Sequence, residues 1–133
     1  MGEATYTIGY GNQPLKRFLG KLIQYKIDVL VDVRSKPHSR HAQYNRKALQ
    51  TSVEMLGIHY LYLGNALGGL GENEGFDEAI AYVTRMSDGG VRACLTCAEE
   101  KSSACHRSKT LAPALKKLGI EIVHIEYEHE LSD

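Results

Sequence analysis

Short apolar runs alternate with amphipathic segments along the chain, and this alternation limits the folds that it can adopt. The clearest apolar run spans residues 27–33 and is rich in β-branched side chains. A nearly continuous apolar strand of this kind is typical of a parallel sheet, which is buried on both faces. Parallel strands need long crossover connections, usually helices. The pattern therefore predicts an α/β domain with a mostly parallel sheet.

We predict five strands and four helices in one domain. The strands are expected at residues 6–8, 27–33, 58–63, 91–97 and 121–125, and the helices at 14–23, 45–57, 76–87 and from between Ser103 and Ser108 to Gly119. The chain has 133 residues, which is one domain's worth. Right-handed crossovers then place helices on both faces of the sheet, which gives three layers over residues 1–133.

Polar residues follow the first, second and fourth predicted strands. Ligands bind open α/β sheets at the carboxyl ends of the strands, where the strand order reverses, so these three ends should be neighbours. The order 3-2-1-4-5 satisfies this condition. An alternative order, in which the short first strand is displaced outward, stays open.

Two segments between these elements are less regular. Residues 64–75 contain five glycines and are predicted to form a loop near the site. Pro113 lies inside the fourth helix if that helix begins at Ser103, and just beyond its first turn if it begins near Ser108. The start of this helix is left open between those residues.

The segment after the fourth strand gathers reactive side chains within eleven residues. They are Cys97, Glu99, Cys105, His106 and Arg107. In an enzyme, Cys105 or a bound water would be the nucleophile, and His106 or Glu99 the acid or base. A helix N-terminus together with His106 and Arg107 would lower the pKa of the Cys105 thiol, although a packed, unreactive cysteine is the alternative.

Further candidates follow the first two strands. Gly9, Tyr10 and Gly11 form a segment whose glycines permit a tight turn or a close approach to a ligand. Asp32 and Arg34 lie on one face of the second strand because side chains alternate along a strand. Arg34 and Arg107 are predicted to bind an anion, or to pair with Asp32 and Glu99 as structural ion pairs.

The region after the second strand is locally basic. Sixteen basic residues balance sixteen acidic residues in the whole chain, yet no Asp or Glu occurs from Val33 to Val53. Lys36, Arg40, Arg46 and Lys47 fall in this stretch, and Asn45 is predicted to cap the helix there. Ser39 and Asn45 are further ligand-binding candidates, and Asp32 is a further catalytic candidate.

The chain resembles the family catalogued as domain of unknown function 488. The resemblance rests on four motifs, which are T-I-G-Y-G, V-D-V-R-S-K-P-H-S-R, G-I-H-Y-L-Y-L-G and C-A-E-E-K-S-S-A-C-H-R-S. It covers nearly the whole chain and implies no established activity. The positions that match the motifs of the family are Asp32, Arg34, Pro37, Asn45, Cys97, Glu99, Cys105, His106 and Arg107.

No cofactor is predicted. Cys94 and Cys97 form a C-x-x-C pattern, but positions three apart in a strand point to opposite faces, so a redox pair is disfavoured and Cys94 is assigned to the core. A metal site built from Cys97, Cys105 and His106 is a minority interpretation, because it lacks an obvious fourth ligand. A phosphatase-type loop is excluded because Ser103, not arginine, lies six positions after Cys97.

The sequence therefore predicts a small α/β protein with a cleft at the carboxyl ends of its strands. The cleft is expected to accept a phosphate-bearing or other anionic ligand, for instance a nucleotide, with hydrolase or transferase chemistry if the protein is an enzyme. The alternative is a ligand-binding or nucleic-acid-binding regulatory module without turnover. Three cysteines, with no leader or long apolar span, predict a cytoplasmic protein that does not enter a membrane.

Overall fold

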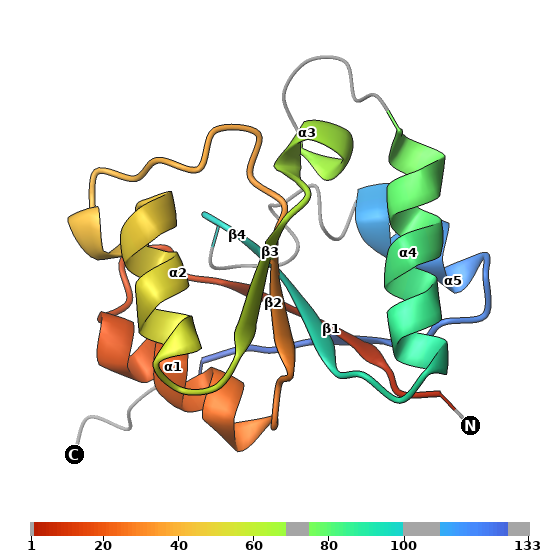
Figure 1. The fold of residues 1–133 in the computed structure, drawn as a ribbon, viewed down its shortest axis with the longest axis horizontal. Coiled ribbons are helices and arrows are strands. Elements are labelled where there is room, and N and C mark those ends of the chain that lie inside the picture. Colours follow the sequence, from red (N-terminus) through yellow and green to blue (C-terminus); the bar gives the residue numbers. More distant parts are fainter. Residues whose placement is uncertain (1, 69–74, 100–109, 128–133) are drawn as a thin grey trace.

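The computed structural model describes residues 2–68, 75–99 and 110–127, and its centre is a five-stranded parallel sheet between two layers of helices (Figure 1). The strands are β1 (Thr5–Gly9), β2 (Val29–Asp32), β3 (His59–Tyr62), β4 (Ala93–Cys97) and β5 (Ile122–His124). Every pair of neighbouring strands is parallel. The predicted α/β class and parallel sheet are confirmed.

The strand order is β3-β2-β4-β1-β5, so the predicted order 3-2-1-4-5 is wrong. β4 lies between β2 and β1, with Thr96 opposite Asp32 on one side and Ile8 on the other. This order is the alternative with the first strand displaced outward. The central position suits β4, because all five of its residues are buried. Both orders bring the carboxyl ends of β1, β2 and β4 together, so that condition alone could not choose between them.

The helices divide between the two faces of the sheet (Figure 1). α1 (Leu15–Gln24) and α2 (Arg46–Glu54) cover one face, and a short 3-10 helix, η1 (Ala42–Tyr44), precedes α2. α4 (Phe76–Asp88) and α5 (Ala112–Lys116) cover the other face. α1 follows β1 and lies on one face, whereas α5 follows β4 and lies on the other. Because β1 and β4 are neighbouring strands, a crevice forms between them at their carboxyl ends.

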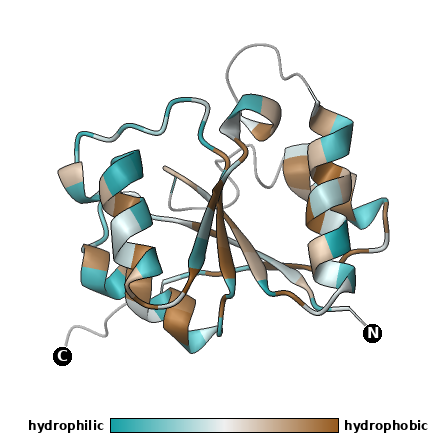
Figure 2. Ribbon diagram, in the orientation of Figure 1, coloured by the Kyte–Doolittle hydropathy of each residue, from teal (hydrophilic) through white to brown (hydrophobic). Residues whose placement is uncertain are grey.

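Each face has its own hydrophobic core, and apolar colouring follows the sheet in Figure 2. Phe18 of α1 packs with Cys94 in one core, whereas Cys97 lies in the other. The prediction that the two C-x-x-C cysteines point to opposite faces is therefore confirmed. The helices also carry apolar side chains outside these cores, since Ile23 of α1 and Leu56, which follows α2, are 56% and 43% exposed.

The glycine-rich segment does not form a simple loop. Its first residues form a short helix, α3 (Gly64–Leu67), although glycine has a low helix propensity. A side chain at Gly64 would meet the carbonyl oxygen of Arg34, so the contact between α3 and the chain after β2 requires glycine there. Tertiary packing thus outweighs local propensity. Residues 69–74 lie outside the described residues.

α5 begins late enough to accommodate its proline. Thr110 and Leu111 form a π-helical turn, and the α-helix starts at Ala112, with Pro113 in its first turn. A proline is tolerated there because the first N–H groups of a helix have no partner within it. The segment between Ser103 and Ser108 lies outside the described residues. Across the described part of the chain, no helix is both long and apolar enough to cross a membrane.

Candidate functional site

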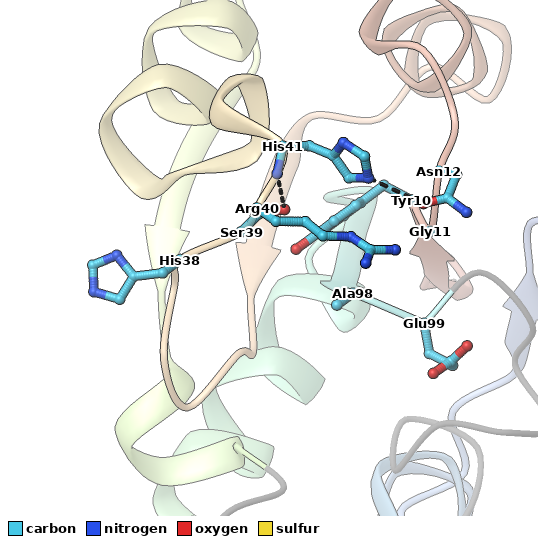
Figure 3. A pocket seen from close by; sticks show the side chains of 9 residues that line it. All are labelled: Tyr10, Gly11, Asn12, His38, Ser39, Arg40, His41, Ala98 and Glu99. Atoms are coloured by element: carbon cyan, nitrogen blue, oxygen red, sulfur yellow. Dashed lines mark hydrogen bonds between the residues drawn. The ribbon is translucent and has the colours of Figure 1, made fainter.

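A cleft of about 400 Å³ opens at the carboxyl ends of β1, β2 and β4 (Figure 3). Three segments form its walls, and each follows one of these strands. The lining residues are Tyr10, Gly11, Asn12, His38, Ser39, Arg40, His41, Ala98 and Glu99. The predicted meeting of these three strand ends is therefore confirmed. Tyr10, Gly11, Ser39 and Glu99 are candidates that the sequence analysis named.

The segment after β1 is fixed against the segment after β4. Gly11 has a φ of 50°, in the left-handed region that favours glycine, and its N–H donates to the carbonyl of Ala98 at 2.8 Å. The carbonyl of Gly9, another predicted ligand-binding residue, accepts a hydrogen bond from the hydroxyl of Tyr127 at 2.6 Å. Gly9 thus supports the turn, whereas Gly11 forms part of the cleft wall.

The wall after β2 is held by side chains within its own loop. Asn45 precedes α2 as predicted, but its side chain does not cap that helix. Its Oδ1 instead accepts the N–H of Ser39 at 2.6 Å, and Ser39 Oγ accepts the N–H of His41 at 3.0 Å. His41 Nε2 lies 3.0 Å from Asn12 Oδ1, so a hydrogen bond joins this wall to the segment after β1 (Figure 3).

Asp32 and Arg34 form a buried ion pair beside the cleft. The Nε and Nη2 atoms of Arg34 donate to the two carboxylate oxygens of Asp32 at 2.8 and 2.7 Å, and the pair is 0–4% exposed. This two-bond geometry is the strong form of an arginine–carboxylate contact. The predicted structural ion pair is confirmed. Burial lowers the pKa of Arg34, but the hydrogen bond and charge of Asp32 outweigh burial and raise that pKa above its usual value.

The same guanidinium also connects two of the cleft walls. Arg34 Nη1 donates to the hydroxyl of Tyr10 at 3.0 Å and to the carbonyl of Tyr44 at 2.6 Å. The rings of Tyr10 and Tyr44 are stacked, with centroids 4.0 Å apart. Tyr10 follows β1 and Tyr44 ends η1, so Arg34 fixes the position of one wall relative to the other.

The carboxylate of Asp32 has a third donor. The hydroxyl of Tyr60, from β3, donates to Asp32 Oδ2 at 2.5 Å. Burial raises the pKa of Tyr60, and the hydrogen bond to Asp32 raises it further. Asp32 is 0% exposed and does not line the cleft, so its predicted catalytic role stays a prediction.

The cleft contains charges of both signs. Arg40 extends from the wall after β2 toward the side formed by Asn12 and Glu99, whereas His38 points away from the other labelled side chains (Figure 3). Arg40 is exposed and makes no hydrogen bond or ion pair with the residues that the structure describes. Arg40 and Glu99 thus both line the cleft, although the carboxylate of Glu99 points away from the guanidinium of Arg40 in Figure 3.

Several predicted site residues lie outside the described residues. These are Cys105, His106 and Arg107, so the predicted convergence of Arg34 and Arg107 and the reactivity of Cys105 stay predictions. The minority metal site at Cys97, Cys105 and His106 is untested for the same reason. Within residues 2–68, 75–99 and 110–127, no group of three or more His, Cys, Asp or Glu side chains could hold a metal ion.

Some residues that build the site were not among the candidates chosen from the sequence. Asn12, His38 and His41 line the cleft, and Tyr44 and Tyr60 bond to the buried ion pair. Arg40, which also lines the cleft, was named only as one cation of the stretch without acidic residues, and that stretch gave no reason to choose it over the others. Nothing in the local sequence near Tyr60 indicates Asp32 as its partner.

Comparison with known protein families gives a match for one part of the chain. Residues 14–75 match the model of a family described as "Domain of unknown function DUF488". This match runs from the start of α1 past α3 and includes the wall after β2, but not β1, β4 or the segment after β4. No curated protein and no solved structure matches the chain. The chain therefore contains a DUF488 family domain at residues 14–75, and its resemblance to that family, which was expected over nearly the whole chain, is confirmed for these residues.

Proposed function

We propose that the cleft binds a small phosphate-bearing or other anionic ligand. The observation that carries this proposal is Arg40, an arginine without a partner among the described residues, in the wall of a cleft of about 400 Å³. A guanidinium binds phosphate and carboxylate groups through parallel hydrogen bonds. The cleft also lies at the carboxyl ends of parallel strands, which is where open α/β sheets bind their ligands.

Two further features support the proposal. His41 adds an imidazole to the cleft lining and holds the wall after β1 through Asn12. His38 lines the same cleft, although its ring points away from the other labelled side chains (Figure 3). Arg34 holds two walls of the cleft in place, because four of its N–H groups bond to Asp32, Tyr10 and Tyr44, but it is buried and does not line the cleft itself. In this proposal Arg40 makes the main contact with the anion.

The first prediction concerns this contact. Replacing Arg40 with methionine should weaken the binding of inorganic phosphate at least tenfold, because a hydrogen bond to a charged group contributes about 1.5–3 kcal/mol and tenfold is about 1.4 kcal/mol. Isothermal titration calorimetry measures the affinity. Lys117→Met is the matched control, because Lys117 is an exposed cation at the end of α5, on the other face of the sheet. Equal losses in both variants would refute a direct contact.

If the ligand is turned over, the proposed chemistry is hydrolase or transferase chemistry. Cys105 or a water would attack the phosphorus atom of a phosphate ester and break its bond to the ester oxygen. His106 or Glu99 would take the proton of the nucleophile and give it to the leaving oxygen, and Arg34 and Arg107 would stabilise the charge. Glu99 supports this version because it lines the cleft. A burst of product followed by a stable adduct at Cys105 in mass spectrometry would support the covalent route, and turnover by a Cys105→Ser variant at the original rate would exclude it.

The second candidate function is nucleic-acid binding without turnover. One observation favours it: Lys36, Arg40, Arg46 and Lys47 are all exposed, and none pairs with an acidic residue in the described structure. Cations on a surface neutralise backbone phosphates and release counterions.

This candidate makes its own prediction. The logarithm of the affinity for single-stranded DNA should fall with the logarithm of salt concentration, with a slope of about 0.7 per phosphate contact. Fluorescence anisotropy at several salt concentrations measures the slope, and the variant Lys36→Met/Lys47→Met should reduce it by about 1.4. Undetectable binding at low salt would remove this candidate.

A further inference from the structure

The side chain of Tyr10 is buried, yet it lines the cleft. It is 2% exposed and extends from the segment after β1 toward the wall after β2 (Figure 3). Its phenol oxygen accepts a hydrogen bond from Nη1 of Arg34 at 3.0 Å, but none of the described residues accepts the proton of this hydroxyl. A buried donor without an acceptor is unfavourable. The proton of Tyr10 is therefore suited to an acceptor that enters the cleft.

Arg34 makes the Tyr10 hydroxyl a stronger donor. Hydrogen bonds that run in series polarise one another, and the first donor of this series is a cation. Asp32 holds the guanidinium through two hydrogen bonds, and the stack on Tyr44 holds the phenol ring. The hydroxyl is thus fixed before a ligand arrives, which lowers the entropy cost of binding. Arg34 is a positioning residue in this arrangement.

Ser39 carries a second hydroxyl of the same kind on the wall after β2. Its Oγ accepts the N–H of His41 at 3.0 Å, and no residue in the described part of the chain accepts its own proton. In Tyr10 and Ser39 alike, the protein uses the oxygen as an acceptor, which leaves the O–H group to donate. With Arg40, which is exposed, three donors from two walls line the same cleft (Figure 3).

The number and origin of these donors narrow the geometry of the anion. The free oxygens of a phosphate or sulfate group point in three or more directions. The two oxygens of a carboxylate lie in one plane and suit the parallel fork of a single arginine. We infer that Tyr10, Ser39 and Arg40 donate to different oxygens of one tetrahedral oxyanion, a phosphate or sulfate group. This inference rests on the proposed anion-binding function of the same cleft.

The first test removes single hydroxyl groups. Tyr10→Phe keeps the ring but should weaken the binding of inorganic phosphate about tenfold in isothermal titration calorimetry, because a hydrogen bond to a charged group is lost. Tyr60→Phe is the matched control, since the Tyr60 hydroxyl bonds to the same ion pair through Asp32 but does not line the cleft. Its affinity should change by less than about twofold, because the donors in the cleft remain.

The outcomes of this test are distinct. Equal affinities in Tyr10→Phe and the unmodified protein, or equal losses in Tyr10→Phe and Tyr60→Phe, would overturn the inference. Ser39→Ala should also weaken phosphate binding about tenfold, so the inference stays testable if Tyr10→Phe does not fold. An absence of phosphate binding by the unmodified protein would instead refute the proposed function itself.

A comparison of ligands tests the geometry of the anion. Phosphate and sulfate are tetrahedral, whereas malonate is a dianion with two planar carboxylates. Both tetrahedral anions should bind about tenfold more tightly than malonate, because a carboxylate leaves one donor of the cleft without an acceptor. The tighter of the two shows which group the natural ligand carries. Malonate binding as tight as that of phosphate and sulfate would contradict the selection of a tetrahedral anion.

Discussion

Replacing Arg34 with methionine should lower the free energy of unfolding by about 3–5 kcal/mol, because a buried charge without its partner is strongly destabilising. The carboxylate of Asp32 is 0% exposed and, among the described residues, would keep only the hydroxyl of Tyr60 and the backbone N–H at position 34 as donors. The hydroxyl of Tyr10 and the carbonyl of Tyr44 would also lose a donor. Urea denaturation followed by circular dichroism measures the loss.

Two further variants separate the ion pair from its other contacts. Arg34→Lys keeps the positive charge but has no planar fork with which to reach Tyr10 and Tyr44, so its loss should be about 1–3 kcal/mol. In the double variant Asp32→Asn/Arg34→Met no charge remains, so it should lose less than the sum of its two single variants. Additive losses would show that the two side chains do not stabilise each other.

Replacing Gly64 with alanine should destabilise the protein by about 3 kcal/mol, at the upper end of the cost of overpacking. A Cβ there would meet the backbone carbonyl oxygen of Arg34 and the ring of Tyr62. The backbone oxygen cannot rotate away as a flexible side chain would, so α3 or the chain after β2 must move. Thermal unfolding compared with the unmodified protein measures the effect.

A second glycine in a helix provides the control. Gly20 lies within α1, and a Cβ at this position would have no atom within 4 Å. Gly20→Ala should therefore stabilise the protein by up to about 1 kcal/mol, through helix propensity alone. A loss of stability in Gly64→Ala together with a gain in Gly20→Ala would distinguish the effect of close packing from the effect of helix propensity. A neutral Gly64→Ala would mean that α3 does not pack tightly on the chain after β2.

The elements of the fold were predictable because their signals are local. The β-branched run before Arg34 and the apolar spacing that places Phe18 and Leu22 on one face of α1 depend only on residues close in sequence. The order of the strands was not predictable in this way. The strand order depends on which strands pair in three dimensions, and such pairing joins residues that are far apart in the sequence. The apolar pattern of β1 is compatible both with a central position in the sheet and with its observed position beside β5. α3 was missed for a related reason, since the contact between Gly64 and Arg34 that fixes it is not local.

The candidate site was predictable in part. Strand alternation placed Asp32 and Arg34 on one face, and the ion pair follows from that placement. Alternation could not show that Tyr10, Tyr44 and Tyr60 would bond to the pair, because these residues come from three separate segments. The role of Arg40 depends on the path of the loop after β2, which bonds such as that between Ser39 and Asn45 determine.

The central position of β4 has a consequence for the order in which the sheet can assemble. During synthesis β1, β2 and β3 leave the ribosome first, but β1 and β2 do not pair with each other, and the strand that joins them spans residues 93–97. Until those residues emerge, β1 and β2 keep unpaired backbone groups on the edges that β4 later covers. Exposed strand edges are templates for pairing with other chains. A nascent or truncated chain that stops at residue 75, where the family match ends, would therefore hold the pair β2–β3 and a β1 strand without either of its partners, and it would be prone to aggregation.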